Sequence, residues 1–252
     1  MSIKLTDSNS IVDFFQSNWD KFIGYINTYI TDPRREKLIS FYTKHEDEVA
    51  MMPASHKKAY HNAFPGGYVD HVNRVVQYAI EQSRLYEKMG GTLDYTDEQL
   101  VFSALFHDLG KIGDGDAPNY IPQTDKWRQD KLSEMYTFNP DLQFMLIPDR
   151  SLFILQKFGI KVDQKEFLGI RCHDGVFDKA NEAYFFSNVE SSRQKTALVS
   201  VLHSADFLAS KVEYDMWKNK GGSTIPTTKK TKASTGRRVN SSEGLSKMLK
   251  NL

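Results

Sequence analysis

Cysteine is almost absent from this chain, since Cys172 is the only one among 252 residues. A single thiol excludes a disulfide bond within the chain and a zinc site built from several cysteines. Proteins that use cysteine so sparingly are typical of reducing compartments. We therefore expect a cytoplasmic protein.

Long apolar runs are missing as well. No segment of the sequence approaches the roughly 18–20 apolar residues that a membrane-spanning helix requires, so we expect no membrane partner. The N-terminal segment MSIKLTDSNSIVDFF does not join a basic stretch to an apolar one, as a secretory signal does. The hydrophobic content of 40% is nevertheless enough for one substantial core.

The chain as a whole has little excess charge, with a net charge of +1. Residues 218–252, however, hold nine lysines and arginines against one acid, a balance of +8 that leaves −7 for the residues before them. Because this tail is small, polar and basic, we expect it to be disordered. It could bind nucleic acid without sequence preference, or it could serve only solubility.

Apolar residues recur at helical spacing over most of the chain, and capping signals mark several helix ends. Thr96-Asp97-Glu98-Gln99 and Asp163-x-x-Glu166 are capping boxes, and Gly90-Gly91 is a helix stop. The segments that we predict as helices are 9–30, 33–50, 68–89, 97–110, 151–158, 164–172 and 193–217.

Residues 112–140 differ from the rest because they are rich in Gly, Asp, Asn and Pro. We expect a long functional loop there, with a short hairpin near WRQDKLSEMYTF. The fold class that follows is all-α, with one helical domain that carries this loop. We expect an N-terminal helical extension (1–55) packed on the main domain (56–217), followed by the basic tail (218–252).

A His-Asp pair alone carries little weight, because the chain has two, His107-Asp108 and His173-Asp174. The first pair stands out because it ends an apolar helix and continues into Leu109-Gly110-Lys111. Two ligand-type side chains at a helix end, followed by a glycine turn and a lysine, suit an exposed site for a metal and a phosphate.

Other ligand-type residues lie near the ends of predicted helices. His71 follows the turn Pro65-Gly66-Gly67, His173 closes a helix, and His203 and Asp206 share one face of the last helix. A lone histidine is most often a satisfied structural residue. The convergence of several in a chain with only seven histidines indicates a functional site instead.

Four segments follow one another along the chain: FPGGYVDHVNRV (64–75), LFHDLGKIG (105–113), RCHDG (171–175) and VLHSADFLAS (201–210). In this order they resemble the motifs of the HD-domain superfamily of metal-dependent phosphohydrolases. The similarity covers roughly residues 60–215 and is closest to stand-alone HD hydrolases and to the HD part of certain bacterial exoribonucleases. The resemblance implies an HD-type helical domain over residues 56–217.

The resemblance also implies a ligand set. His71, His107, Asp108 and Asp206 match the four primary metal ligands of the family. Two imidazoles and two carboxylates suit a divalent cation such as Mn²⁺, Fe²⁺, Co²⁺, Ni²⁺, Mg²⁺ or Zn²⁺. Lys111 matches the family lysine near the substrate phosphate, although it could be only a cation at a helix C-terminus.

The sequence departs from the two-metal members of the family. Ser151 occupies the place where we expect a further histidine, and His173-Asp174 replaces a double histidine. We therefore expect one metal ion rather than two. His173 then becomes a general acid or base, or a phosphate contact, so the residues that we expect to be catalytic are Asp108, Lys111 and His173.

Further substrate contacts are predicted with less support from motifs. Arg150 and Arg171 could bind a phosphate, or could form surface ion pairs. Trp127 is the candidate for stacking on a base, together with Tyr120 and Tyr136, although loop aromatics are also often buried.

The remaining histidines divide into two groups. We expect His203 to hold a metal ligand in orientation. No motif supports His45, His56 or His61, which we treat as ordinary.

The function that these residues predict is hydrolysis of a nucleotide phosphate ester by a metal-activated water. A 3′-5′ exonuclease or other nuclease acting on nucleic acid, with the basic tail as an arm, is the alternative. A metal- and nucleotide-binding regulatory protein without turnover is the third. The sequence carries no signal for the oligomeric state.

Overall fold

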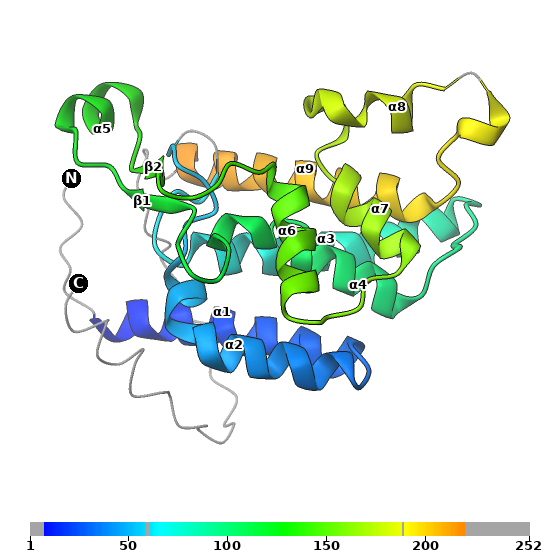
Figure 1. The fold of residues 1–252 in the computed structure, drawn as a ribbon, viewed down its shortest axis with the longest axis horizontal. Helices are drawn as coiled ribbons and strands as arrows, with labels where there is room; N and C mark the ends of the chain where they lie inside the picture. Colours follow the sequence, from blue (N-terminus) through cyan, green and yellow to red (C-terminus); the bar gives the residue numbers. More distant parts are fainter. Residues whose placement is uncertain (1–7, 59–60, 188, 220–252) are drawn as a thin grey trace.

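The computed structural model describes residues 8–58, 61–187 and 189–219, and it is mostly helical, with 66% helix and 4% strand. Figure 1 shows the arrangement of the elements. The α-helices are α1 (Ser8–Tyr29), α2 (Arg34–Met51), α3 (Gly67–Lys88), α4 (Asp97–Phe106), α5 (Lys126–Leu132), α6 (Ile147–Lys157), α7 (Gln164–Cys172), α8 (Glu182–Phe185) and α9 (Ala197–Asn219). The short elements are the 3₁₀ turns η1 (Leu109–Ile112), η2 (Gly175–Phe177), η3 (Lys179–Asn181) and η4 (Glu190–Ser192), and the strands β1 (Tyr120–Pro122) and β2 (Tyr136–Phe138).

The local signals in the sequence produce most of the helix ends that they predict. In the capping box of α4, the backbone N–H of Gln99 donates to Thr96 Oγ1, and the backbone N–H of Thr96 donates to Gln99 Oε1. Asp163 and Glu166 form the same reciprocal pair at α7. These bonds satisfy backbone donors that the first helical turn leaves free.

Three helix starts differ from the prediction. Pro33 stands at the cap position just before α2 rather than inside its first turn. α6 begins at Ile147, earlier than expected, with Pro148 in its first turn. α9 begins at Ala197 and not at residue 193, because residues 193–196 are irregular and follow the 3₁₀ turn η4.

The segment 112–140 is a loop that contains regular structure. β1 and β2 pair antiparallel, with Tyr120 opposite Phe138, and α5 lies between them. The hairpin expected near WRQDKLSEMYTF is present in part, because the last three residues of this stretch form β2, which pairs with β1, whereas its first six residues lie in α5. Asp125 causes the difference, since its carboxylate accepts hydrogen bonds from the backbone N–H groups of Trp127 and Arg128 and so caps a helix.

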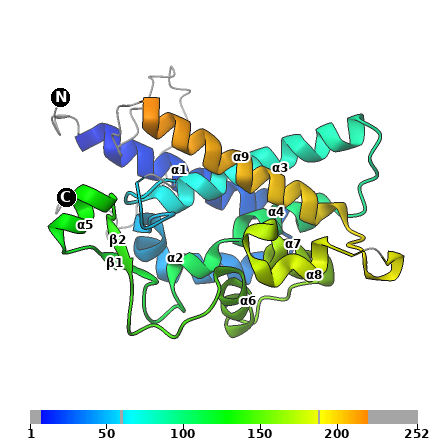
Figure 2. The same ribbon diagram turned by 90° about the horizontal axis from the view of Figure 1, so that it is seen from above.

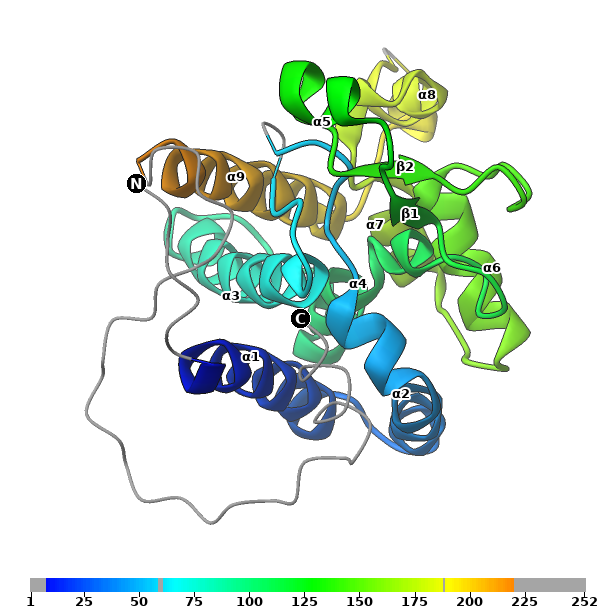
Figure 3. The ribbon, with the colours of Figure 1, turned by 90° about the vertical axis from the view of Figure 1, so that its left-hand side faces the viewer.

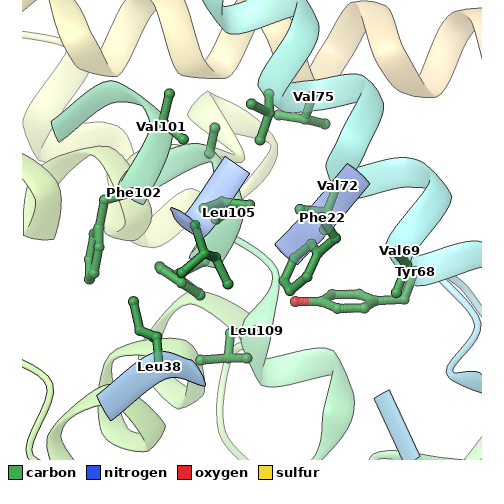
Figure 4. Packing of buried hydrophobic residues seen from close by; sticks show 14 of the residues in the cluster. Phe22, Leu38, Tyr68, Val69, Val72, Val75, Val101, Phe102, Leu105 and Leu109 are labelled. Atoms are coloured by element: carbon green, nitrogen blue, oxygen red, sulfur yellow. The ribbon is translucent and has the colours of Figure 1, made fainter. Parts of the chain in front are cut away.

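α3 is the central helix of the fold. Figure 2 shows α9 running across it, and Figure 3 shows it between α9 and α1, with which it packs. Its valines, among them Val72 and Val75, meet Phe22 of α1 and Leu105 of α4 in one hydrophobic core (Figure 4). Each such buried side chain contributes about 1.5–3 kcal/mol. Every residue of α4 from Leu100 to Phe106 is buried, so the end of α4 delivers His107 to the middle of the molecule.

The ends of the chain fall largely outside the described residues. The predicted basic tail is described only at Lys218 and Asn219, which form the last turn of α9. Among the described helices, none combines the length and the apolar character that crossing a bilayer requires.

Candidate metal centre

Three elements bring the four predicted metal ligands together: α3 supplies His71, the end of α4 supplies His107 and Asp108, and α9 supplies Asp206. Nε2 of His71 lies 3.2 Å from Oδ1 of Asp206 and 3.4 Å from Oδ2 of Asp108. Nε2 of His107 lies 3.7 Å and 3.4 Å from the same two oxygens. Metal–ligand bonds of about 2.1 Å in a tetrahedral shell place neighbouring ligand atoms about 3.4 Å apart. These buried groups could therefore hold a metal ion.

The protonation of the imidazoles fits this use. Nδ1 of His107 donates to the carbonyl oxygen of Ala104 at 2.8 Å, and Nδ1 of His71 donates to the carboxylate of Glu213 at 3.1 Å. Because a carbonyl or a carboxylate oxygen only accepts, Nδ1 carries a hydrogen in both rings, and Nε2 is the atom that each ring can offer to a metal ion in its neutral form. Both Nε2 atoms are buried and have no hydrogen-bond partner among the described residues. Buried polar atoms are rarely left so, and a metal would satisfy both.

The charges around the site favour a cation. Burial opposes a charge on His71, but the carboxylates of Glu213, Asp108 and Asp206 hold the pKa of this imidazole well above its ordinary value. Burial also opposes charge on Asp108 and Asp206. Lys111 and His107 nevertheless hold the pKa of Asp108 well below the usual range, and His107 and His71 do the same for the pKa of Asp206. A divalent cation would offset this concentration of carboxylates more fully than a single proton on His71.

α6 fixes the turn that carries His107 and Asp108. A Cβ at Gly110 would lie 2.4 Å from the carbonyl oxygen of Ile147, so only glycine allows this close approach. The hydroxyl of Ser151 accepts from Gly110 N at 2.7 Å and lies 3.0 Å from the carbonyl oxygen of His107, to which it donates. Ser151 is fully buried and holds the backbone of this turn. It occupies the position at which the family resemblance predicts a further histidine in two-metal proteins.

Lys111 lies directly against the ligands. Its Nζ is 2.5 Å from Oδ2 of Asp108, and it donates to Nε2 of His61 at 3.3 Å. Burial disfavours the ammonium, but Asp108 raises the pKa of Lys111 above its ordinary value, so the side chain stays charged. A lysine held in this way is more than a cation at the end of a helix.

A cavity of about 930 Å³ opens beside these residues. Its lining joins the metal centre to groups from α6, α7, η2 and α9, namely His61, Asp108, Lys111, Ile147, His173, Asp174, Phe177, His203, Asp206, Phe207, Ser210, Lys211 and Tyr214. Nε2 of His173 lies 3.6 Å from both Asp108 Oδ1 and Asp174 Oδ1. Burial lowers the pKa of His173, but Asp174 and Asp108 outweigh it and raise the pKa to about 9. A charged imidazolium therefore faces the cavity at neutral pH.

Three predicted substrate contacts lie away from this cavity. Arg150 is buried and donates to Asn119 Oδ1 and to the carbonyl oxygens of Gln143 and Gly110, so its guanidinium supports the turn and contacts no open space. Arg171 is committed to ion pairs with Asp149 and Asp178, in keeping with the alternative of an ion-pair residue.

Trp127 also lies elsewhere: it is on α5, 60% of its surface is exposed, and it is not part of the cavity lining. Tyr120 is buried against Phe138, and neither it nor Tyr136 lines the cavity. The tyrosines of the loop are thus packing residues, as the alternative to base stacking anticipates.

The sequence did not reveal His61 and Glu213. Glu213 follows Asp206 by seven residues, two helical turns along one face of α9, a spacing that could have identified it once Asp206 was chosen. His61 lies in a non-helical segment, and its ring centroid is 4.8 Å from that of His71. A Cβ at Gly67 would lie 2.0 Å from the carbonyl oxygen of Asn62. The second glycine of the Pro65-Gly66-Gly67 turn therefore allows the backbone of Asn62, the residue after His61, to lie close to the start of α3.

His203 holds the backbone rather than a ligand. Its Nδ1 donates to the carbonyl oxygen of His173 at 2.7 Å, so it positions the end of α7 and not Asp206. His45 and His56 stay outside the cavity.

Comparisons with protein-family models, curated proteins and solved structures give no match for this chain.

Proposed function

We propose that this chain is an HD-type metal-dependent phosphohydrolase that cleaves a phosphate ester of a nucleotide. One observation carries the proposal: the unpartnered Nε2 atoms of His71 and His107 face the carboxylates of Asp108 and Asp206 next to the ammonium of Lys111, at the edge of a large cavity. This combination offers a place for a divalent cation and, beside it, a positive charge for a phosphate.

The residues around the cation site have distinct proposed roles. His71, His107, Asp108 and Asp206 would hold a divalent cation. When bound, such a cation would lower the pKa of a water molecule and polarise a phosphoryl oxygen. The ammonium of Lys111 offsets negative charge that develops on the phosphoryl oxygens.

His173 is the proposed proton donor. Its imidazolium faces the cavity and can donate to the leaving oxygen of the ester, because the carboxylates of Asp108 and Asp174 hold it in the protonated form. Its Nδ1 donates to the carbonyl oxygen of Ile170 at 2.8 Å, so the ring is fixed with Nε2 toward the cavity.

The test is a screen with defined metals. The purified chain is loaded separately with Mn²⁺, Ni²⁺, Mg²⁺ or Zn²⁺ and offered nucleoside mono- and triphosphates, cyclic nucleotides and short oligonucleotides. Release of phosphate or nucleoside from a mononucleotide supports the proposal. Turnover of oligonucleotides alone supports a nuclease, and tight metal binding without any turnover supports a regulatory protein. Failure to bind any of the metals contradicts all three.

A further inference from the structure

The cavity beside the metal centre has an aromatic wall. Phe177 of η2 and Phe207 of α9 both line it, with ring centroids 6.1 Å apart and planes inclined by only 10°. Phe177 is 76% exposed and Phe207 is 38% exposed. The two rings are stacked on each other and form an exposed apolar cluster in the cavity lining. None of the metal chemistry above uses this cluster.

The backbone places this wall next to the metal ligands. Phe207 directly follows Asp206 on α9, so one residue contributes to the metal centre and the next to the wall. η2 carries Phe177 close to α9 because Gly175, at φ +57°, allows the chain to pass His203, where a Cβ would lie 2.4 Å from the imidazole. A side chain at this position would move Phe177 away from Phe207.

A cation completes the arrangement. Lys211 lies one helical turn beyond Phe207, and its Nζ is 5.0 Å from the centre of the Phe207 ring. The lining of the cavity thus combines cationic and metal-binding groups with the two aromatic rings and with Lys211, which lies against Phe207. A ligand that matches this lining carries both an anionic group and a flat aromatic group.

We propose that Phe177 and Phe207 form a subsite that stacks the base of a single nucleoside phosphate, whose phosphate group lies against Lys111 and the metal ligands. This inference rests on the proposed function and names its substrate class. A cavity of about 930 Å³ is within the usual range for a small-molecule ligand. Because every base has a flat π surface, stacking on the two rings gives little preference among bases.

The test compares two substrates that differ only in the base, adenosine 5′-monophosphate and ribose 5-phosphate. Phe177→Ala/Phe207→Ala is expected to raise KM for the nucleotide about tenfold or more and to leave KM for ribose 5-phosphate unchanged. Phe207→Trp should keep the wild-type preference, because indole also stacks.

The matched controls are Phe144→Ala and Phe153→Ala. These phenylalanines lie outside the cavity and are 79% and 41% exposed, close to the values for Phe177 and Phe207. Neither control should change KM for either compound. An equal rise for both compounds in the double variant, or no rise for the nucleotide, overturns the subsite.

Binding separates this inference from the proposed function. If the wild-type protein hydrolyses neither compound, calorimetry with Mn²⁺ and each compound replaces KM. Tighter binding of adenosine 5′-monophosphate that the double variant loses supports the subsite even where hydrolysis fails. Equal binding of the two compounds overturns it, as does a phenylalanine dependence that appears only with oligonucleotides.

Discussion

The candidate metal centre and the aromatic wall of the same cavity are built in opposite ways. His71 and His107 are 0% exposed and lie on or next to the long helices of the core, with Nδ1 of each ring held by a hydrogen bond. Phe177, 76% exposed, comes from a three-residue turn. Coordination tolerates only small errors in position, whereas stacking on a flat ring tolerates larger ones. Substitutions in the metal centre should therefore change metal binding and turnover, and substitutions in the wall should change substrate affinity.

The largest expected effect is at the ligands themselves. His107→Ala or Asp108→Ala should abolish metal-dependent hydrolysis and lower the bound metal, because each removes a donor from the set. His45→Ala is the matched control, since His45 is also buried but lies outside the cavity. Metal analysis after desalting and a hydrolysis assay measure both effects. Full activity of either ligand variant at wild-type metal content would disprove the assignment.

A smaller effect is expected at the residue that orients His71. Glu213→Gln keeps the size of the side chain but removes the negative charge of the carboxylate, which accepts a hydrogen bond from Nδ1 of His71. Substitution of a residue that orients a metal ligand typically lowers the metal affinity about 10–100-fold. A competition titration with a chelator measures the metal Kd without any need for turnover. Asp215→Asn, an exposed change two residues along the same helix, should leave the Kd unchanged, and an equally unchanged Kd for Glu213→Gln would refute the orienting role.

The sequence predicted that His71, His107, Asp108 and Asp206 belong together but gave no sign of the wall, for a physical reason. Periodic apolar residues and capping boxes fix the core helices, and the expected ligand positions on them come from the resemblance of four motifs to a known family. Phe177 and His61 reach the cavity through irregular segments, where a single close approach at Gly175 or Gly67 decides the path. Such approaches leave no periodic pattern in a sequence.

Trp127 and Arg150 show that residue type alone does not predict a contact with substrate. Both residue types bind nucleotides well in general, and both were predicted to bind substrate on their chemistry alone. The structure uses Arg150 to hold the backbone of Gly110 and places Trp127 on a helix of the loop. Which partner a guanidinium or an indole finds depends on tertiary packing that local sequence does not encode.

We expect the hydrogen bonds of Ser151 to the turn that carries His107 and Asp108 to contribute to the free energy of unfolding. Ser151→Ala removes the hydroxyl that accepts from Gly110 N and leaves this buried N–H without a partner. An unsatisfied buried donor costs about 1–3 kcal/mol, so the free energy of unfolding measured with urea should fall by about that much. Ser191→Ala, at an exposed serine, should leave the free energy of unfolding almost unchanged. Equal stability of the two variants would mean that Ser151 does not hold the turn.

The smallest expected effect concerns Asp174, which lines the same cavity. It belongs to a group with His173 and Asp206 whose ligand atoms are within 4.8 Å of one another, so a second cation has a conceivable place. We nevertheless predict one tightly bound cation per chain, because Ser151, at the position expected of a further histidine, bonds to the backbone of the turn and not toward the cavity. Elemental analysis of desalted protein should give one equivalent for the wild type and for Asp174→Asn alike. Two equivalents in the wild type, falling to one in Asp174→Asn, would contradict the prediction and would place a second cation among His173, Asp174 and Asp206.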